Sequence, residues 1–268
     1  MPSLPEHLLT NDGIVQAEIR DGHTALITLN RPAARNAVNA DVANKIDALV
    51  EATEHDPQIR AVVLASSHPD VFSAGADLKE VSAGRGDTLS TERGGFAGLV
   101  FSKREKPWIA AVNGKALAGG CELALACDMV VASEKAAFGL PEVLRGLIAA
   151  AGGLYRLPRI LPPNIALEVI ATAIPIDAER AYRLGLVNRL VEPDEVVEQA
   201  LLLANQIAVN APIAVRESLR VARAAFQMSE TEMRKLTRDA RAVVVASNDF
   251  KEGPLAFIEK RAPNWTGT

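Results

Sequence analysis

Residues Ala116–Cys127 read ALAGGCELALAC, a run of small and apolar residues with one charged side chain, Glu122. A carboxylate in such surroundings is costly unless it is paired or has a chemical task. Gly119 and Gly120 precede it, and we expect a short helix to open at Gly120, with free backbone N–H groups at its start. An acid and N–H donors this close together outline a hydrolytic or enolate-forming site.

Two further segments have the same character. Residues 136–144 (AAFGLPEVL) contain a second isolated acid, Glu142, and Pro141 favours extended backbone before it. Residues 71–78 (VFSAGADL) end an apolar run in small residues, which would let N–H groups approach a ligand closely. Each segment also has a plain interpretation, because a buried Glu is often paired with Lys or Arg and a small-residue turn is often only a turn. The residues alone leave both interpretations open.

Composition excludes several function classes. The 268 residues are 49% hydrophobic and 23% charged, as in ordinary soluble globular proteins, and suffice for one large domain with a small addition. The net charge of −4 and the scattered Lys and Arg argue against a nucleic-acid partner or an anionic membrane surface. No run of about 18 apolar residues predicts a membrane span. We therefore expect no nucleic-acid partner and no membrane association.

The reactive residue types point to a reducing compartment. Cys121 and Cys127 lie in the apolar segment, and we expect both to be buried and reduced. The four histidines show no metal-ligand spacing, so no metal site is expected. The first ten residues lack the basic region of a secretion or import signal. These features predict a cytoplasmic protein.

The hydrophobic pattern predicts an α/β fold. Asp21-Gly22 predicts a hairpin turn between strands at 14–19 and 24–29, and Asn39 could cap a helix to about Thr53. Strands and helices then alternate through residue 133, which implies a parallel sheet. The further strands are expected at 60–66, 108–112 and 129–132, and helices at 196–210, 212–226, 230–247 and 255–260. No internal sequence repeat is visible.

Several motifs together resemble the crotonase family, also called the enoyl-CoA hydratase/isomerase family. In chain order they are ITLNRP (27–32), RNAVN (35–39), FSAGADL (72–78), PWIAAVNG (107–114), GGCEL (119–123), ACD (126–128), FGLPE (138–142), DFKEG (249–253), AF (256–257) and EKR (259–261). Each motif alone is weak, but their order and spacing from about residue 13 to the C-terminus are specific.

The resemblance implies an overall organisation. Residues 1–195 would form a crotonase-like ββα spiral core with the acyl-CoA site, and residues 196–268 a helical region for oligomerisation and CoA contact. It further implies a homotrimer or a dimer of trimers. Coenzyme A would be part of the substrate, so no separate cofactor is expected.

The resemblance also implies site roles. The backbone N–H groups of Ala76 and Gly119 would form an oxyanion hole, and Glu122 and Glu142 would be the acid/base pair. The helix dipole favours an ionised Glu122, which suits a base that holds water, while Glu142 would exchange the α-proton, although this division stays open. The other expected substrate contacts are Arg35, Asn36, Ala37, Val38, Ser73, Ala74, Gly75, Asp77, Leu78, Gly120, Pro141, Ala150 and Lys260.

Some of these contacts have alternatives. Arg35 is a candidate for the CoA phosphates, and Lys260 with Arg261 for the 3′-phosphate, from the same or a neighbouring subunit. They could equally be solvated surface charges, and Asn36 could hydrogen-bond locally. Residues 82–95 (SAGRGDTLSTERGG) lack a period that could bury an apolar face, so we expect a mobile loop bordering the acyl pocket. Its flanking residues Val81, Phe96 and Leu99 could supply apolar wall, and a surface loop remote from the site is the alternative.

In the family that the chain resembles, hydratases carry both glutamates and isomerases often keep only the second, so the resemblance favours water addition over a double-bond shift. The expected function is therefore that of a 2-enoyl-CoA hydratase. Alternatives are carnitinyl-CoA dehydratase-like activity, enoyl-CoA isomerase activity, and acyl-CoA binding without turnover. Residues 146–153 (GLIAAAGG) depart from the family pattern, with Ala150 where glycine is common, and Ala173 follows Thr172 where glycine is usual. These departures concern the shape of the acyl group and not the reaction class.

Overall fold

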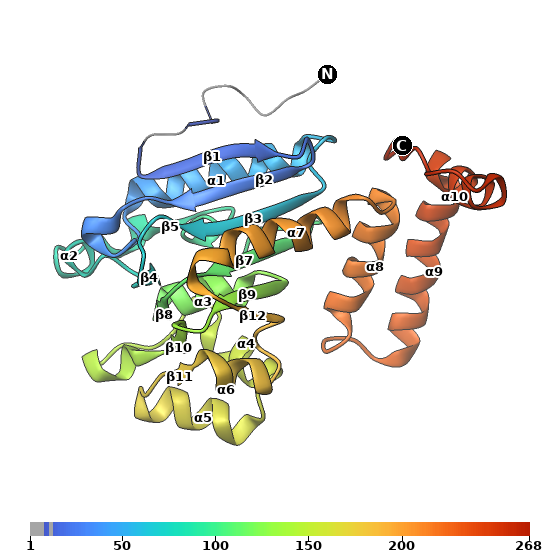
Figure 1. Cartoon of the computed structure of the whole chain (residues 1–268). Coiled ribbons are helices and arrows are strands. Elements are labelled where there is room, and N and C mark those ends of the chain that lie inside the picture. Colours follow the sequence, from blue (N-terminus) through green and yellow to red (C-terminus); the bar gives the residue numbers. More distant parts are fainter. Residues whose placement is uncertain (1–7, 11–12) are drawn as a thin grey trace.

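A six-stranded sheet forms the centre of the fold (Figure 1), in a computed structural model that describes residues 8–10 and 13–268. In spatial order its strands are β1 (Val15–Arg20), β2 (Thr24–Leu29), β3 (Ala61–Ser66), β7 (Trp108–Val112), β9 (Met129–Ser133) and β12 (Arg189–Val191). The β1–β2 hairpin is antiparallel and every other neighbouring pair is parallel. Asp21 and Gly22 have φ angles of 50° and 75°, as a tight hairpin turn requires. The expected hairpin and parallel sheet are confirmed.

A smaller sheet runs beside the first and positions the site. Its strands are β4 (Val71–Ser73), β8 (Lys115–Leu117), β10 (Ala137–Gly139) and β11 (Ile176–Asp177), in the order β11-β10-β8-β4. The chain alternates between the sheets, from β3 to β4, from β7 to β8 and from β9 to β10. A helical segment follows each of β4, β8 and β10: α2 (Leu78–Ser82), α3 (Gly119–Ala126) and the 3₁₀ helix η3 (Pro141–Arg145).

This alternation collects three distant segments at one edge. Strands β4, β8 and β10 are parallel neighbours, so their carboxyl ends face the same side. The segments that follow them therefore start next to one another. Ala76, Gly119 and Glu142 belong to these three segments.

Burial in the core explains why the residues of α3 are small or apolar. All eight residues of α3 are buried, which leaves room only for Gly, Ala, Cys and Leu around its one acid. Helix α1 (Ala40–His55) begins at Asn39, whose side chain accepts a hydrogen bond from the Val42 N–H, and buries an apolar stripe. Helix α7 (Val196–Ala208) packs Val196, Ala200 and Ala204 against the six-stranded sheet. Helix α7 therefore belongs to the main body of the molecule, which contains both sheets, and the helices that extend away from this body follow α7 in the chain.

The C-terminal helices form that extension. Helices α8 (Pro212–Ala224) and α9 (Glu230–Ala246) run antiparallel beside the body, and α10 (Asn248–Glu259) lies at the end of α9 (Figure 1). The expected helix at 255–260 is only the second half of α10. The prediction missed its start at Asn248, where the Ser247 side chain accepts a hydrogen bond from the Phe250 N–H. The remaining helices are α4 (Gly153–Ile160), α5 (Pro163–Thr172), α6 (Ala178–Arg183) and the 3₁₀ helices η1 (Pro32–Ala34) and η4 (Pro193–Glu195).

Residues 82–95 contain more structure than we expected. They include the 3₁₀ helix η2 (Gly86–Leu89), and a small hairpin joins β5 (Ser90–Thr91) to β6 (Gly95–Phe96). Leu89 is buried, and the Thr91 hydroxyl donates to Asp47 of α1 over 2.9 Å. Arg93 forms ion pairs with Asp47 and Glu51. The absence of a periodic apolar face did not reveal this anchoring, because a single buried leucine provides it; the mobility of the loop stays a prediction.

Cys121 is buried, as expected, whereas Cys127 is only half-buried, and neither is in a disulfide. Across residues 8–10 and 13–268, no group of three or more His, Cys, Asp and Glu side chains could hold a metal ion. Within the same residues, no helix combines the length and apolar character needed to cross a bilayer.

Candidate active site

Residues 35–38 and 74–77 pair with each other through the backbone. The Val38 N–H donates to the Gly75 carbonyl over 2.8 Å, and the Asp77 N–H donates to the Val38 carbonyl over 2.9 Å. Gly75 has a φ of +86°, and a Cβ there would lie 2.6 Å from the Gly119 nitrogen. Only glycine fits at this position. The segment before α2 therefore lies in backbone contact with the start of α3.

Two backbone N–H groups at this contact are free. Gly119 is the first residue of α3, so its N–H has no partner within the helix. In the part of the chain that the structure describes, neither the Gly119 nor the Ala76 N–H donates a hydrogen bond to another backbone or side-chain group. Both residues line a cavity of about 630 Å³. The cavity thus has two backbone donors at one place on its wall.

The rest of the cavity wall is mainly apolar. It is formed by side chains that follow the smaller sheet and by the η2 region: Leu78, Val81, Leu89, Phe96, Phe101, Leu117, Pro141, Leu147 and Ile148. The charged residues of the described lining are Arg35, Arg145, Glu122 and Glu142. The two acids therefore face a mostly apolar space.

Glu122 is held by the start of a second helix. The residue is only 3% exposed, and its Oε1 accepts a hydrogen bond of 2.9 Å from the N–H of Gly153, the first residue of α4. Burial raises the pKa of Glu122 to about 7, and the nearby Glu142 carboxylate adds to the rise, although the Gly153 N–H opposes it. Loss of hydration thus opposes the ionised form that the helix dipole favours, and the division of roles between the two acids stays open.

Glu142 lies in the first turn of η3, directly after Pro141. Burial raises its pKa, while the Arg145 guanidinium acts in the opposite direction. Its Oε2 is buried and accepts no hydrogen bond from the described residues. Two carboxyl groups with raised pKa values in one cavity are typical of an acid/base site.

Six of the expected substrate contacts, including Gly75 described above, support the wall of the site without lining the cavity. The Asn36 amide donates to the Ser66 hydroxyl and the Phe72 carbonyl, and the Ser73 hydroxyl donates to the Asn36 carbonyl. Asn36 therefore forms hydrogen bonds within the protein, which was the alternative to a substrate contact. Val38 is buried. A Cβ at Gly120 would overlap the Ser73 carbonyl, and Asp77 caps α2 and pairs with Arg31.

The other expected contacts divide into two groups. Arg35, Ala37, Ala74, Leu78, Pro141 and Ala150 line the cavity, as do Val81 and Phe96. Lys260 directly follows α10, which lies at the far right of the molecule, away from α3 at its centre and from α2 at the far left (Figure 1). Arg261 is held by Glu252 and Glu259. One chain therefore does not bring Lys260 to the cavity.

Leu99 was misplaced by the sequence reasoning, which also missed some residues of the site. Leu99 is fully buried in the core and does not line the cavity. Phe101 and Ile148 line it, and Gly153 binds Glu122. Gly152 has a φ of 109° and directly precedes α4. The Gly-Gly pair at 152–153 is therefore the sequence signal that could have indicated a helix start, and with it the Gly153 N–H donor.

Comparison with known proteins identifies the family. Residues 20–268 match the family model described as Enoyl-CoA hydratase/isomerase. The chain belongs to the enoyl-CoA hydratase/isomerase family. A relative named carnitinyl-CoA dehydratase, from Salmonella arizonae, is 40% identical over 253 residues, which cover 92% of this chain and 97% of the relative. The relative of the same name from Proteus mirabilis is also 40% identical and covers 92% of this chain and 96% of its own.

Solved structures of the family confirm the crotonase fold. The enoyl-CoA hydratase from Mycobacterium tuberculosis superposes with a TM-score of 0.91 at 42% identity, covering 96% of this chain and all of the other. The structure named carnitinyl-CoA hydratase from Mycobacterium avium has a TM-score of 0.76 at 46% identity, covering 95% of this chain and 99% of the other. The expected α/β fold with a helical C-terminal region is confirmed.

Proposed function

We propose that the protein adds water reversibly across the C=C bond of 2-enoyl-CoA thioesters. Hydratase or dehydratase chemistry on CoA thioesters, and thus a hydro-lyase, is what its family and relatives support. The observation that favours hydration most is the single cavity that contains both glutamates and both free N–H groups. The substrate contains the coenzyme A, so we propose no further cofactor.

The geometry suggests a division of tasks. The thioester oxygen would accept hydrogen bonds from the Ala76 and Gly119 N–H groups, which stabilise the negative charge of an enolate. One glutamate, as carboxylate, would take a proton from water while the water oxygen bonds to the β-carbon. The other, as carboxylic acid, would give its proton to the α-carbon. The pKa of about 7 lets Glu122 supply either form near neutral pH.

The cavity wall favours an apolar acyl group. Besides the two glutamates, the described lining contains no acid that could pair with a quaternary ammonium, and Arg145 adds a positive charge. A carnitinyl group would bring such an ammonium into the same space. The second candidate is nevertheless carnitinyl-CoA dehydratase activity, because relatives of that name are 40% identical.

Ultraviolet monitoring of the conjugated thioester tests both candidates. The assay compares crotonyl-CoA, longer straight-chain 2-enoyl-CoAs and crotonobetainyl-CoA at equal concentrations. We expect loss of absorbance with the straight-chain substrates and a kcat/KM at least ~10-fold lower with crotonobetainyl-CoA, since an unpaired cation in an apolar site is disfavoured. A preference for crotonobetainyl-CoA would assign the second candidate, and absence of turnover with all three would contradict the hydratase proposal.

We further propose a cytoplasmic homotrimer or dimer of trimers. The described C-terminal helices expose Phe257 and Ile258 on α10 and Val243 on α9, apolar area that a second copy could cover. A neighbouring copy could also bring Lys260 to the CoA 3′-phosphate. Sedimentation at micromolar concentration should give three or six times the chain mass of 28.5 kDa. Lys260→Ala should raise KM for crotonyl-CoA and not for the 3′-dephospho thioester, whereas equal changes would reject this contact.

A further inference from the structure

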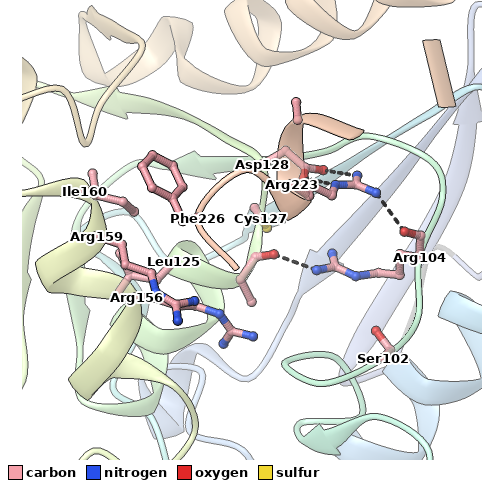
Figure 2. Close-up of a pocket in the computed structure, with 12 residues that line it drawn as sticks. Ser102, Arg104, Leu125, Cys127, Asp128, Arg156, Arg159, Ile160, Arg223 and Phe226 are labelled. Atoms are coloured by element: carbon pink, nitrogen blue, oxygen red, sulfur yellow. Dashed lines mark hydrogen bonds and ion pairs between the residues drawn. The ribbon is translucent and has the colours of Figure 1, made fainter. Parts of the chain in front are cut away.

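A second cavity, of about 460 Å³, lies at the other end of α3 (Figure 2). Its wall comes from the last residues of α3, from α4 and from α8, and it shares no lining residue with the first cavity. The charged residues of the described lining are four arginines and one acid: Arg104, Arg156, Arg159, Arg223 and Asp128. This cavity therefore has a large excess of positive charge.

Asp128 neutralises only one of the four arginines. Arg223 Nε and Nη2 donate to the two Asp128 oxygens over 2.7 and 2.8 Å. The remaining Arg223 donors bind the carbonyls of Arg104 and Lys106. Asp128 also accepts a hydrogen bond from the Trp108 N–H. Arg104, Arg156 and Arg159 have no acid of their own in this lining.

Arg104 has two buried guanidinium nitrogens. Its Nη2 donates to the Ala126 carbonyl over 2.6 Å, and its guanidinium lies 5.1 Å from the centre of the Trp108 ring. Its Nε and Nη1 are buried and donate to no acceptor in the described part of the chain. Burial and Arg223 lower the pKa of Arg104, and the acids Asp128 and Glu54 offset this only in part. An incompletely paired buried charge is costly, and a bound anion would remove much of that cost.

Helix α4 supplies the facing charges. Figure 2 shows the guanidinium groups of Arg156 and Arg159 entering the cavity from the side opposite Arg104. Arg156 donates to the carbonyls of Ala151 and Val100. Arg159 makes no hydrogen bond or ion pair with the described residues and only lies over the Tyr155 ring. Arg104 and Arg159 thus lie on opposite sides of the cavity, and each has N–H groups without an acceptor in the described part of the chain.

We propose that this cavity binds a phosphate group between Arg104 and Arg159, with Arg156 as a third positive charge. The planar guanidinium fork matches phosphate oxygens, and a phosphate dianion compensates more of the three charges than one carboxylate. Ile160 and Phe226 line the same cavity and leave apolar wall for the organic part of a phosphomonoester. The phosphate group can therefore come from inorganic phosphate or from such an ester.

Equilibrium dialysis on the full-length oligomer tests the site. The probes are radiolabelled inorganic phosphate and a short alkyl phosphomonoester, with chloride held constant. We expect saturable binding of one phosphate per chain that a non-hydrolysable acyl-CoA analogue does not displace, because the two cavities share no residues. A lower dissociation constant for the ester would identify an organic phosphate as the ligand, and equal constants would identify the free ion.

Variants locate the binding. Arg159→Ala removes an exposed side chain and should weaken phosphate binding at least ~10-fold, the loss expected for a charge-assisted hydrogen bond. Arg104→Met keeps the apolar stem over Trp108 and should abolish binding. The control is Arg183→Ala, an exposed arginine of α6 paired with Glu179, which should leave binding unchanged. Non-saturable binding, displacement by the acyl-CoA analogue, or equal binding by Arg159→Ala and the unchanged protein would each overturn the proposal.

Discussion

The two ends of α3 contrast sharply although the helix is only eight residues long. At the N-terminal end, the free Gly119 N–H and the acid Glu122 face an apolar cavity. At the C-terminal end, the Ala126 carbonyl accepts a hydrogen bond from Arg104 in a cavity lined by arginines. Negative charge near a helix start and positive charge near its end are both favoured by the helix dipole.

Burial acts against the charge at both ends. It raises the pKa of Glu122 to about 7 and lowers the pKa of Arg104. For a carboxyl group this matters near neutral pH, where Glu122 can both give and take a proton. A lowered pKa does not change the protonation of Arg104 at neutral pH, because Arg keeps its proton. The free-energy cost of its buried charge can therefore only be offset by a nearby anion. The same burial therefore makes one end suited to proton transfer and the other to binding.

The largest expected effect on kcat is the loss of either acid, Glu122 or Glu142, in the cavity at the N-terminal end of α3. We expect Glu122→Gln and Glu142→Gln each to lower kcat for hydration by at least ~100-fold with little change in acyl-CoA affinity, because each acid acts mainly in the transition state. Steady-state kinetics with crotonyl-CoA measures this.

The matched controls lie elsewhere on the chain. Glu134→Gln changes an exposed acid between β9 and β10 and should leave kcat unchanged. Arg104→Met, at the far end of α3, should keep kcat within a few-fold. Near-full hydration by Glu122→Gln would show that the N-terminal end is not the acid/base site.

A smaller effect on kcat should follow from a change of shape beside Gly119. Gly75→Ala places a Cβ 2.6 Å from the Gly119 nitrogen and should displace an oxyanion donor. We expect kcat to fall by about 10- to 100-fold, less than complete loss of a donor would cause. Gly84→Ala is the control, since Gly84 also has a positive φ but a Cβ there meets nothing within 4 Å. Equal activity of the two variants would mean that the contact with Gly119 is unimportant for turnover.

The raised pKa of Glu122 should also appear in the free energy of unfolding. Its carboxyl group titrates near pH 7 in the folded chain and near pH 4.3 when unfolded, so between these values the folded state binds more protons. Stability should therefore fall as pH rises through that window, by at most roughly 4 kcal/mol from this group. Urea unfolding of the unchanged protein and of Glu122→Gln, at about pH 5 and pH 8, measures the difference. Parallel pH dependence in both proteins would contradict the raised pKa.

From the sequence we expected Gly119 and Glu122 to lie in one site at the N-terminal end of α3, and we did not expect the arginine-lined cavity at its C-terminal end. Isolated acids in apolar segments are visible in a sequence, and so are the small residues that permit close backbone contact, as at Gly75. The arginine cavity unites Arg104, Arg159 and Arg223 from three separate segments that look like ordinary surface charge. Only the packing of α8 and α4 around α3 brings them together.

The repeated arrangement of the strands was likewise hidden. Strands β3 and β4, β7 and β8, and β9 and β10 alternate between two sheets, yet their sequences share no visible repeat. A strand buried on both faces requires only apolar residues of suitable size, which many sequences satisfy. The spiral arrangement could be predicted only from the family motifs. Leu89 is a different case, because one buried side chain anchors residues 86–96 although their sequence has no apolar period.

The smallest expected effect concerns the segment that closes the first cavity. Gly86, Leu89, Ser90 and Phe96 line that cavity, and their segment is attached to α1 mainly through Leu89, Thr91 and Arg93. We expect a non-reactive acyl-CoA analogue to slow amide hydrogen exchange across residues 86–96 by about 3-fold or more, since few contacts hold this segment without ligand. Residues 226–229, between α8 and α9, do not line the first cavity and should exchange at equal rates with and without the analogue. Equal exchange of residues 86–96 in both states would show that this segment is a fixed wall, and that ligand binding at the N-terminal end of α3 orders nothing beyond the acids and donors already in place.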